Sequence, residues 1–365
     1  MATTFKTAFN SIYLTAHLPE EVTIETDAAC LEVNIFVNDT KVFKSVYYPY
    51  NQMVCVRDIR SIIEASMYER QLVMASLRIE VYEPVNSMTS TNVSIDENGN
   101  YVVTFDSDGS SPSNATVDSV KMVYCRFKSS VSSEGYLGSY FLTTRKSVLI
   151  PRSGKLSLSN YTKAYAQGNN FALIYYSLSQ FSGQIFTYNA NLGKMQSTAE
   201  KIVTAELSYT NFKSTVDQAL GTDCIVHGVE YQIGIRQFNI FFTDEKPTEM
   251  FNFLNAFNME ETAYLFNTTS IKTEVDRSEA VCGHRTQFYD ETINVKHEVE
   301  TAPLTYDEAK WLNQMLTSKL VKRTINDEES AEVLISDISS EVTDSDKELI
   351  RIKFSWKYAD GNEWI

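Results

Sequence analysis

The chain has 365 residues, and its 47 acidic and 32 basic side chains give a formal net charge of −15. A negative protein repels phosphate groups, so the composition excludes nucleic-acid binding as an expected function. The sequence also lacks an uninterrupted run of about 18 apolar residues, the length that a membrane-spanning helix needs, and we therefore expect no membrane insertion.

The chain is too long for a single ordinary core, and the hydrophobic fraction of 43% is sufficient to fill several. Tyr and Phe, at 21 and 20 residues, are enriched in a way that favours strands or contact surfaces. The predicted fold is mainly β, with β-sandwich or barrel-like domains and a few short helices packed on the sheets. We expect three domains: a β-rich domain with one short helix at 1–86, a strand-and-loop domain at 87–200, and a β domain with a capped helix at 201–365.

The cysteine pattern and the N-terminus indicate where the protein is made. The cysteines lack any C-x-x-C pair and are typical of reduced, mostly buried thiols: Cys30, Cys55, Cys125, Cys224 and Cys282. The segment from Met1 to Leu18 has neither the apolar core nor the cleavage site of a secretory signal. We expect synthesis in the cytoplasm without export by the ordinary route.

Alternating apolar residues between Val22 and Tyr82 predict strands, with a hairpin at 31–46 that turns at Asn38-Asp39. Asp58 is predicted to cap a short helix whose apolar face holds Ile59, Ile62, Ile63 and Met67. A second hairpin is expected at 93–105 around Asn98-Gly99, and the following segment, 106–114, is expected to be a loop.

Further strands are expected along the remaining chain. Short apolar runs suit a sandwich, and firmer strand patterns follow; they cover 117–127, 147–150, 171–176, 184–188, 202–207, 225–242, 262–266, 288–299, 333–338 and 349–358. Pro247 and Thr248 predict the start of a short helix that runs through Phe257.

The segment from Ile293 to Leu316 has the most definite local pattern. Ile293, Val295 and Val299 share one face of a strand, with His297 on the same side. Thr305 and Glu308 predict a capping box at the start of a helix over 305–318. Its apolar stripe holds Tyr306, Ala309, Leu312, Met315 and Leu316, with Trp311 beside it. A helix this short is marginal alone, so we expect Tyr306 and Trp311 to anchor it to its own sheet.

Residue patterns that carry chemistry are mostly missing. Cys224 and His227 are three apart in a strand-like run, which places them on opposite sides, and Cys282 with His284 is half of a zinc motif. The turn Asp106–Gly109 lacks the full spacing of a calcium loop. No nucleophile elbow, phosphate loop or dinucleotide fingerprint is found. We therefore predict no catalytic residue, no cofactor and no metal, and a protein that is not an enzyme.

One charged passage stands between apolar strands, and it supplies the interaction candidates Glu274, Asp276, Arg277 and Arg285. The first interpretation is a solvated loop. The second is an inter-subunit strap, in which guanidinium and carboxylate groups of neighbouring copies pair.

The segment Thr301–Thr305, continued by Glu308-Ala309, Trp311-Leu312 and Leu316–Ser318, resembles the "APLT-x-x-EA-x-WL…L-x-S" segment of virion structural proteins from tailed bacteriophages and prophages of gut Bacteroidetes. The strands at 333–337 and 354–361, and Tyr47-Tyr48-Pro49 before Asp58-Ile59, are similar to those proteins as well. The middle of the chain, about 88–225, has no such match.

The resemblance implies a tail, baseplate or tail-adaptor protein in a virion. Its partners would be copies of itself in a ring or trimer and other virion proteins, with host surface glycans as a further candidate. Two alternatives remain. A carbohydrate-binding or adhesion module would use the many tyrosines as stacking surfaces, and a glycoside hydrolase would need two carboxylates that face each other in a cleft.

Overall fold

The computed structural model describes residues 3–83, 91–95, 101–105, 115–162, 169–178, 183–194, 200–325, 329–340 and 350–361. Most of these residues lie in strands, and the predicted mainly β fold with a few short helices is confirmed. The chain forms two compact units, Met1–Glu134 and Gly135–Ile365, rather than the expected division at 86 and 200. The described strands of the expected middle domain belong to both units, because β10 (Ala115–Val123) pairs in the first unit and β13 (Asn169–Leu178) pairs in the second.

The first unit contains a three-stranded sheet, β1-β3-β6, and a five-stranded sheet, β2-β10-β7-β4-β5. Its elements are β1 (Thr4–Phe5), β2 (Ile12–Leu14), η1 (Thr15–His17), β3 (Glu21–Glu25), β4 (Leu31–Val37), β5 (Thr40–Tyr47), β6 (Met53–Arg57), α1 (Ile59–Glu69), β7 (Met74–Tyr82), β8 (Thr91–Ile95), β9 (Tyr101–Phe105) and β10. Both sheets and α1 contribute to one core, where Val22, Leu31 and Ile63 are fully buried. This unit is a sandwich with a helix packed into the same core.

Local sequence signals predicted most of this unit. The hairpin of β4 and β5 is confirmed, with Asn38 at φ 47° and Asp39 at φ 60° in the turn, a conformation that Asn and Asp tolerate. The helix after Asp58 is also confirmed, but the predicted cap is wrong, because Asp58 has φ 60° and its side chain accepts no capping hydrogen bond. β8 and β9 pair as the expected hairpin. The turn at Asn98-Gly99 and the loop 106–114 lie outside the described residues.

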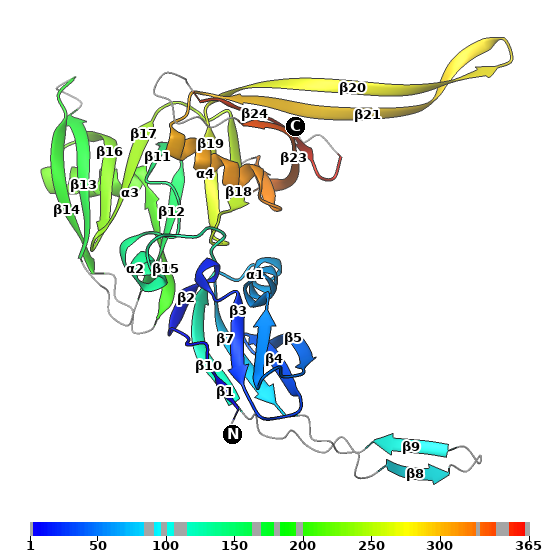
Figure 1. Ribbon diagram of the computed structural model, residues 1–365. Helices are drawn as coiled ribbons and strands as arrows, with labels where there is room; N and C mark the ends of the chain where they lie inside the picture. The colour runs from blue at the N-terminus through cyan, green and yellow to red at the C-terminus, as the bar shows by residue number, and fades with distance from the viewer. Residues whose placement is uncertain are drawn as a thin grey trace. The chain divides into compact units, whose positions relative to one another are not determined.

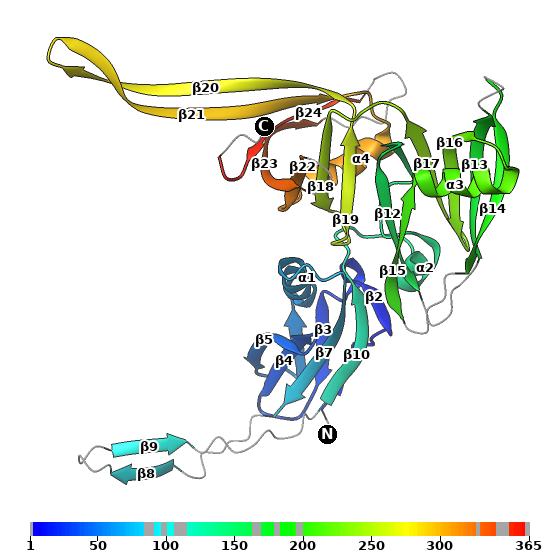
Figure 2. The same ribbon diagram turned by 180° about the vertical axis from the view of Figure 1, so that it is seen from behind.

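The second unit contains a five-stranded sheet, β11-β17-β16-β13-β14, a two-stranded sheet, β12-β15, and a seven-stranded sheet, β19-β18-β22-β23-β24-β21-β20. Figures 1 and 2 show these sheets from opposite sides. The elements are α2 (Ser133–Ser139), which contains the boundary between the units, β11 (Ser147–Pro151), β12 (Lys155–Thr162), β13, β14 (Phe186–Lys194), β15 (Lys201–Ser208), α3 (Tyr209–Leu220), β16 (Cys224–Ile233), β17 (Arg236–Thr243), β18 (Glu249–Leu254), β19 (Glu260–Leu265), β20 (Asn267–Cys282), β21 (Arg285–Thr301), α4 (Tyr306–Leu316), β22 (Val321–Thr324), β23 (Ser330–Ser340) and β24 (Ile352–Tyr358).

Two helical assignments in this unit differ from expectation. The helix predicted from Pro247 is wrong: β18 is a strand between β19 and β22, and its alternate residues Phe251 and Phe253 are buried. Pairing with two neighbours decides its conformation. The helix α3 was not predicted, although its signals are present: Ser208 accepts a hydrogen bond from the Asn211 N–H, and Gly221 follows the last turn with φ 66°.

The predicted helix near the C-terminus is α4, and its capping box is confirmed. The Glu308 N–H donates to Thr305 Oγ1 at 3.3 Å, and the Thr305 N–H donates to Glu308 Oε2 at 2.9 Å. The predicted apolar stripe is buried at Ala309, Leu312 and Met315, where α4 packs on β18 and β23 of the seven-stranded sheet.

The capping box makes α4 testable by one substitution. Thr305→Ala removes the side-chain acceptor for the Glu308 N–H, and we expect the free energy of unfolding to fall by about 1 kcal/mol. Thr305→Ser keeps the acceptor and should stay close to wild type. Urea denaturation of the three proteins measures the difference, and equal stability of the Ala and Ser variants would show that the box does not contribute.

Candidate assembly surface

The strands β20 and β21 form a long two-stranded ribbon, called the arm here, which extends from the seven-stranded sheet (Figure 1). Their register runs from Asn267 opposite Thr301 to Cys282 opposite Arg285. The third strand, β24, pairs with β21 over His297–Glu300. With 16 residues in β20, the arm is roughly 50 Å long at about 3.3 Å per residue.

The end of the arm has a tight turn and a bulge. Gly283 takes φ 66° between the two strands, a conformation that glycine adopts without a steric penalty. Ser278 pairs with Asp290 whereas Glu279 pairs with Phe288, so Tyr289 has no residue opposite it. A bulge of this kind redirects the side chains around it.

One face of the arm is apolar from the sheet as far as Val275 and Ile293, and the Arg277–Glu291 ion pair follows on the same face. Where the arm joins the sheet, this face belongs to the core: Val299 is 3% exposed, and the buried His297 ring stacks on Trp356 with 3.9 Å between ring centroids. The same face continues outward through Ile271, opposite His297, and through the pair Val275 and Ile293. These outer side chains are 66%, 43% and 56% exposed, respectively. The apolar pattern of a core strand therefore continues beyond the point where the core covers it.

The opposite face of the arm is charged and internally paired. Lys272 Nζ lies 2.8 Å from Glu274 Oε1, and Lys296 Nζ lies 3.6 Å from Asp337 Oδ2 of β23. The hydrogen bond from Lys272 lowers the pKa of the Glu274 carboxyl, and Lys296 lowers that of Asp337. The charged side chains of this face are exposed to solvent or form ion pairs. Between the sheet and the pair Val275–Ile293, the two faces of the arm therefore differ in polarity.

All four interaction candidates from the sequence lie in the arm. Glu274 and Asp276 lie on the charged face, and Arg285 stands at the turn opposite Cys282. Arg277 lies on the apolar face, where its Nε is 2.6 Å from Glu291 Oε2 and its guanidinium is 5.1 Å from the centre of the Phe288 ring. The interpretation as a loop is wrong, because these residues lie in paired strands. The interpretation as a strap stays a prediction.

The sequence argument selected the charges and missed the exposed apolar residues. Its signal was present: Ile271, Thr273 and Val275 alternate in β20 as Ile293 and Val295 do in β21. From the sequence, we predict one face of a strand at Ile293 and Val295 but no strand over 267–282. The structure shows that the outer part is uncovered.

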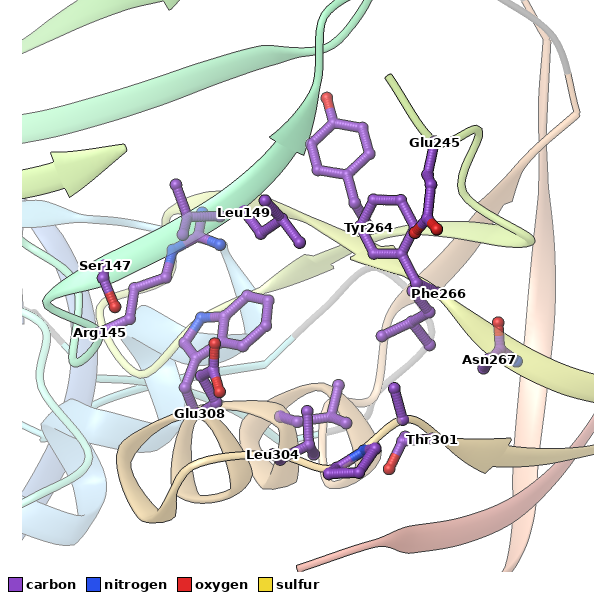
Figure 3. A pocket seen from close by; sticks show the side chains of 16 residues that line it. Arg145, Ser147, Leu149, Glu245, Tyr264, Phe266, Asn267, Thr301, Leu304 and Glu308 are labelled. Carbon is purple, nitrogen blue, oxygen red and sulfur yellow. The ribbon is translucent and has the colours of Figure 1, made fainter. Parts of the chain in front are cut away.

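A pocket of about 280 Å³ lies at the base of the arm (Figure 3). Its lining comes from β11, β19, the start of α4 and the base of both arm strands, with neighbouring loop residues: Arg145, Ser147, Val148, Leu149, Glu245, Tyr264, Leu265, Phe266, Asn267, Thr301, Ala302, Pro303, Leu304, Glu308, Trp311 and Leu312. Most of the lining is apolar. Figure 3 shows Arg145 and Leu149 on one side and Leu304 and Thr301 on another.

A buried ion pair supports the floor of this pocket. Arg145 and Glu261 side chains are each 4% exposed, with 3.5 Å between Arg145 Nε and Glu261 Oε2. Trp311 Nε1 donates to Glu261 Oε2 at 2.5 Å, and Asn255 Nδ2 donates to Glu261 Oε1 at 2.6 Å. Burial lowers the pKa of the Arg145 guanidinium, and the Glu261 carboxylate opposes that effect. Within the described chain, Arg145 Nε and Nη1 have no hydrogen-bond acceptor.

Trp311 lies between these polar groups and the core, as expected for an anchor of α4. Its ring packs edge-on against Phe253 of β18, with 5.6 Å between ring centroids, and the Arg145 guanidinium lies 4.4 Å from its ring centre. The expected attachment of Trp311 to its own sheet is confirmed. Tyr306 is half-buried and packs against the same core.

The described residues contain no cluster of three or more His, Cys, Asp or Glu side chains that could hold a metal ion. Cys224 is buried, whereas His227 of the same strand bonds through Nε2 to Ser177 Oγ at 2.8 Å. Asp106–Gly109 lies outside the described residues. Among the helices that the structure describes, none is long and apolar enough to span a membrane.

Comparisons with known proteins give no family. No family model and no curated protein matches the chain. Two solved structures have limited likeness to it, the calcium-binding domain CBD12 of CALX1.1 and CBD12 from CALX1.2. Their TM-scores are 0.20 and 0.17 at 10% identity, and the matches cover 64% of this chain and 79% and 80% of theirs. A likeness this low defines neither a shared fold nor a shared function.

Trp311 provides a test of the pocket floor. Trp311→Ala leaves a cavity beside Phe253 and removes a donor from buried Glu261, and we expect a loss of roughly 3–5 kcal/mol in the free energy of unfolding. Trp311→Phe keeps most of the packing and should cost less, about 1–3 kcal/mol for the unpaired carboxylate oxygen. Thermal and urea denaturation measure both. Unchanged stability together with lost self-association would assign Trp311 to a partner instead.

Proposed function

We propose that the protein is a structural component of a tailed-phage virion, a tail, baseplate or tail-adaptor protein that works by assembly and catalyses no reaction. The observation that carries this proposal is the apolar face of the arm, which leaves the core and continues into solvent. Copies of the same chain are its first partners, and other virion proteins join them.

The exposed apolar residues of the arm are arranged rather than scattered. Single exposed apolar side chains are normal on soluble proteins, but an aligned series on one face marks a contact surface. Ile271, Val275 and Ile293 form such a series, and Phe288 lies on the same face beyond the Arg277–Glu291 ion pair. Full burial of one such side chain would contribute roughly 1.5–3 kcal/mol, so a partner that covers several of them gains a stable contact.

The geometry of the arm supports the same conclusion. A two-stranded ribbon is at best marginally stable in water when no third strand or helix covers it. Beyond His297 the apolar face of this ribbon has no covering element among the described residues. A neighbouring molecule would supply that cover, and the arm would then hold two molecules together.

The resemblance to phage virion proteins involves the part of the chain that fixes the arm. Thr301 is the last residue of β21, and the Thr305 capping box starts α4 immediately afterwards. The matching residues Ala309, Trp311 and Leu312 are the buried side of α4. The residues that resemble the phage proteins therefore form the base from which the arm projects, and this supports an assembly role.

A glycan-binding module is the second candidate, and one observation favours it. Tyr48 and Tyr50 of the first unit are each 80% exposed, and aromatic faces of this kind stack on sugars. This reading needs no self-association. A protein that remains a 41.5 kDa monomer at all concentrations and binds glycans would replace the proposal.

The arm can be tested with a matched pair of substitutions. Ile293→Lys places a charge on the apolar face, and Asn294→Lys places the same charge on the charged face, opposite Glu274. We expect Ile293→Lys to weaken self-association roughly ten- to hundredfold, because the burial of one large apolar side chain is lost. Asn294→Lys should assemble like wild type.

Light scattering coupled to size-exclusion chromatography gives the mass, and negative-stain imaging gives the shape of the particles. Rings or trimers of the wild-type protein are the expected result. Equal loss of assembly in both variants would mean that charge on the ribbon, rather than its apolar face, controls association. Unchanged thermal unfolding of both variants checks that the fold is intact.

A further inference from the structure

The end of the arm differs in charge from the rest of the chain. The segment 280–289, called the tip here, contains Arg285 and His284 and has no Asp or Glu, in a protein of net charge −15. No ion pair joins Arg285 to another described residue. The tip also carries three exposed large apolar or aromatic side chains, Val281, Phe288 and Tyr289, at 75%, 57% and 70% exposure. It suits an acidic surface with an apolar recess.

Tyr289 is the tip residue that is free to enter such a recess. The bulge leaves it without a cross-strand partner, and its hydroxyl makes no hydrogen bond within the described structure. Phe288 differs, because the Arg277 guanidinium already covers its ring. Tyrosine combines a large apolar ring with a polar end, which suits a pocket that is apolar at its walls and polar at its floor.

The pocket at the base of the arm has the matching properties. Its volume of about 280 Å³ lies just below the roughly 300–1,000 Å³ of pockets for drug-sized molecules, so it suits a side chain. Leu149 and Leu304 offer apolar contacts, and Glu245 and Glu308 supply negative charge. Arg145 also lines the pocket and is the cationic residue of the lining. A phenol oxygen can accept a hydrogen bond from a guanidinium.

The tip of one chain does not reach its own pocket. Thr301, at the base of the arm, lines the pocket, and the paired ribbon between Tyr289 and Thr301 spans roughly 40 Å at about 3.3 Å per residue. The ladder of paired residues along this length prevents the ribbon from folding back on itself. The occupant must therefore come from another molecule.

We infer that Tyr289 at the tip of one copy inserts into the Arg145 pocket of a second copy. This inference rests on the proposed function and names the two surfaces that meet. The tip and the pocket are different surfaces, so copies join head to tail, and such contacts generate a ring when the rotation closes and a filament when it does not. Along the way, the apolar face of the arm lies against the second copy.

Mixing two defective variants tests the head-to-tail geometry. Tyr289→Ala removes the tip side chain, and Leu149→Glu, at a position that is 41% exposed, places a charge in the pocket. Each variant alone should be a monomer at concentrations where wild type assembles. Mixed in equal amounts, they should form a dimer with one intact contact, and no larger species. Tyr289→Phe keeps the aromatic ring, so its self-association should weaken less than that of the Tyr289→Ala variant.

Cross-linking tests the same contact without weakening it. Cys282 is exposed at the tip, and Glu245→Cys adds a thiol at the pocket in a protein that also carries Cys30→Ser and Cys55→Ser. A short bismaleimide should join copies into a ladder of covalent oligomers. The charge-matched control Glu69→Cys, at an exposed position of α1 in the first unit, should give few cross-links.

The outcomes separate this inference from the proposed function. Wild-type oligomers without pocket-specific cross-links, or mixed variants that stay monomeric, would overturn the tip-in-pocket contact and leave the assembly role standing. A wild-type protein that is monomeric at every concentration would overturn both. Cross-links at the pocket and heterodimers in the mixture would support both.

Discussion

The core covers only part of one apolar face of the seven-stranded sheet, and the arm is the part of that sheet that it leaves exposed. Near the sheet, α4 and the neighbouring strands bury Val299, Phe354 and Trp356, and the His297 ring on Trp356 is the last buried layer of that face. Ile271 is paired with His297 in the ladder and is nevertheless 66% exposed. The strands keep their apolar alternation past this point, so backbone pairing extends farther than the core does. What remains is a preformed half of a sandwich, and a second molecule can supply the other half.

The buried pair of Arg145 and Glu261 gives this arrangement its rigidity at the base. Removing two charges from water is costly, and the cost is offset only when the remaining donors and acceptors are satisfied. Glu261 meets that condition through Trp311 and Asn255, whereas Arg145 does not among the described residues. The same carboxylate therefore fixes α4 to the sheet through Trp311 and lies beside the Arg145 guanidinium, which lines the pocket. The Glu261 carboxylate therefore contributes both to the attachment of α4 and to the charge beside the pocket.

Local signals predicted the elements whose causes are local. The capping box of Thr305, the Asn38-Asp39 turn and the apolar stripe of α4 each depend on residues within a few positions, and each is present in the structure. β18 was predicted as a helix because its strand conformation depends on pairing with neighbours, of which β22 is distant in sequence. The exposure of Ile293 was not predictable either, since alternation identifies a face without identifying its cover. The pocket combines Arg145 with residues more than a hundred positions away, and no spacing rule brings them together.

The free edge of the arm carries charged side chains. β20 is the last strand of the sheet, and an unpaired edge of 16 residues invites other strands to add to it. Lys272, Glu274 and Asp276 line the charged side of that strand, and charged side chains on an edge strand oppose the addition of another strand. The net charge of −15 adds a general repulsion between copies. The tip lies between Glu279 and Asp290 and has no carboxylate of its own, so the charge pattern is consistent with the proposed contact through the tip.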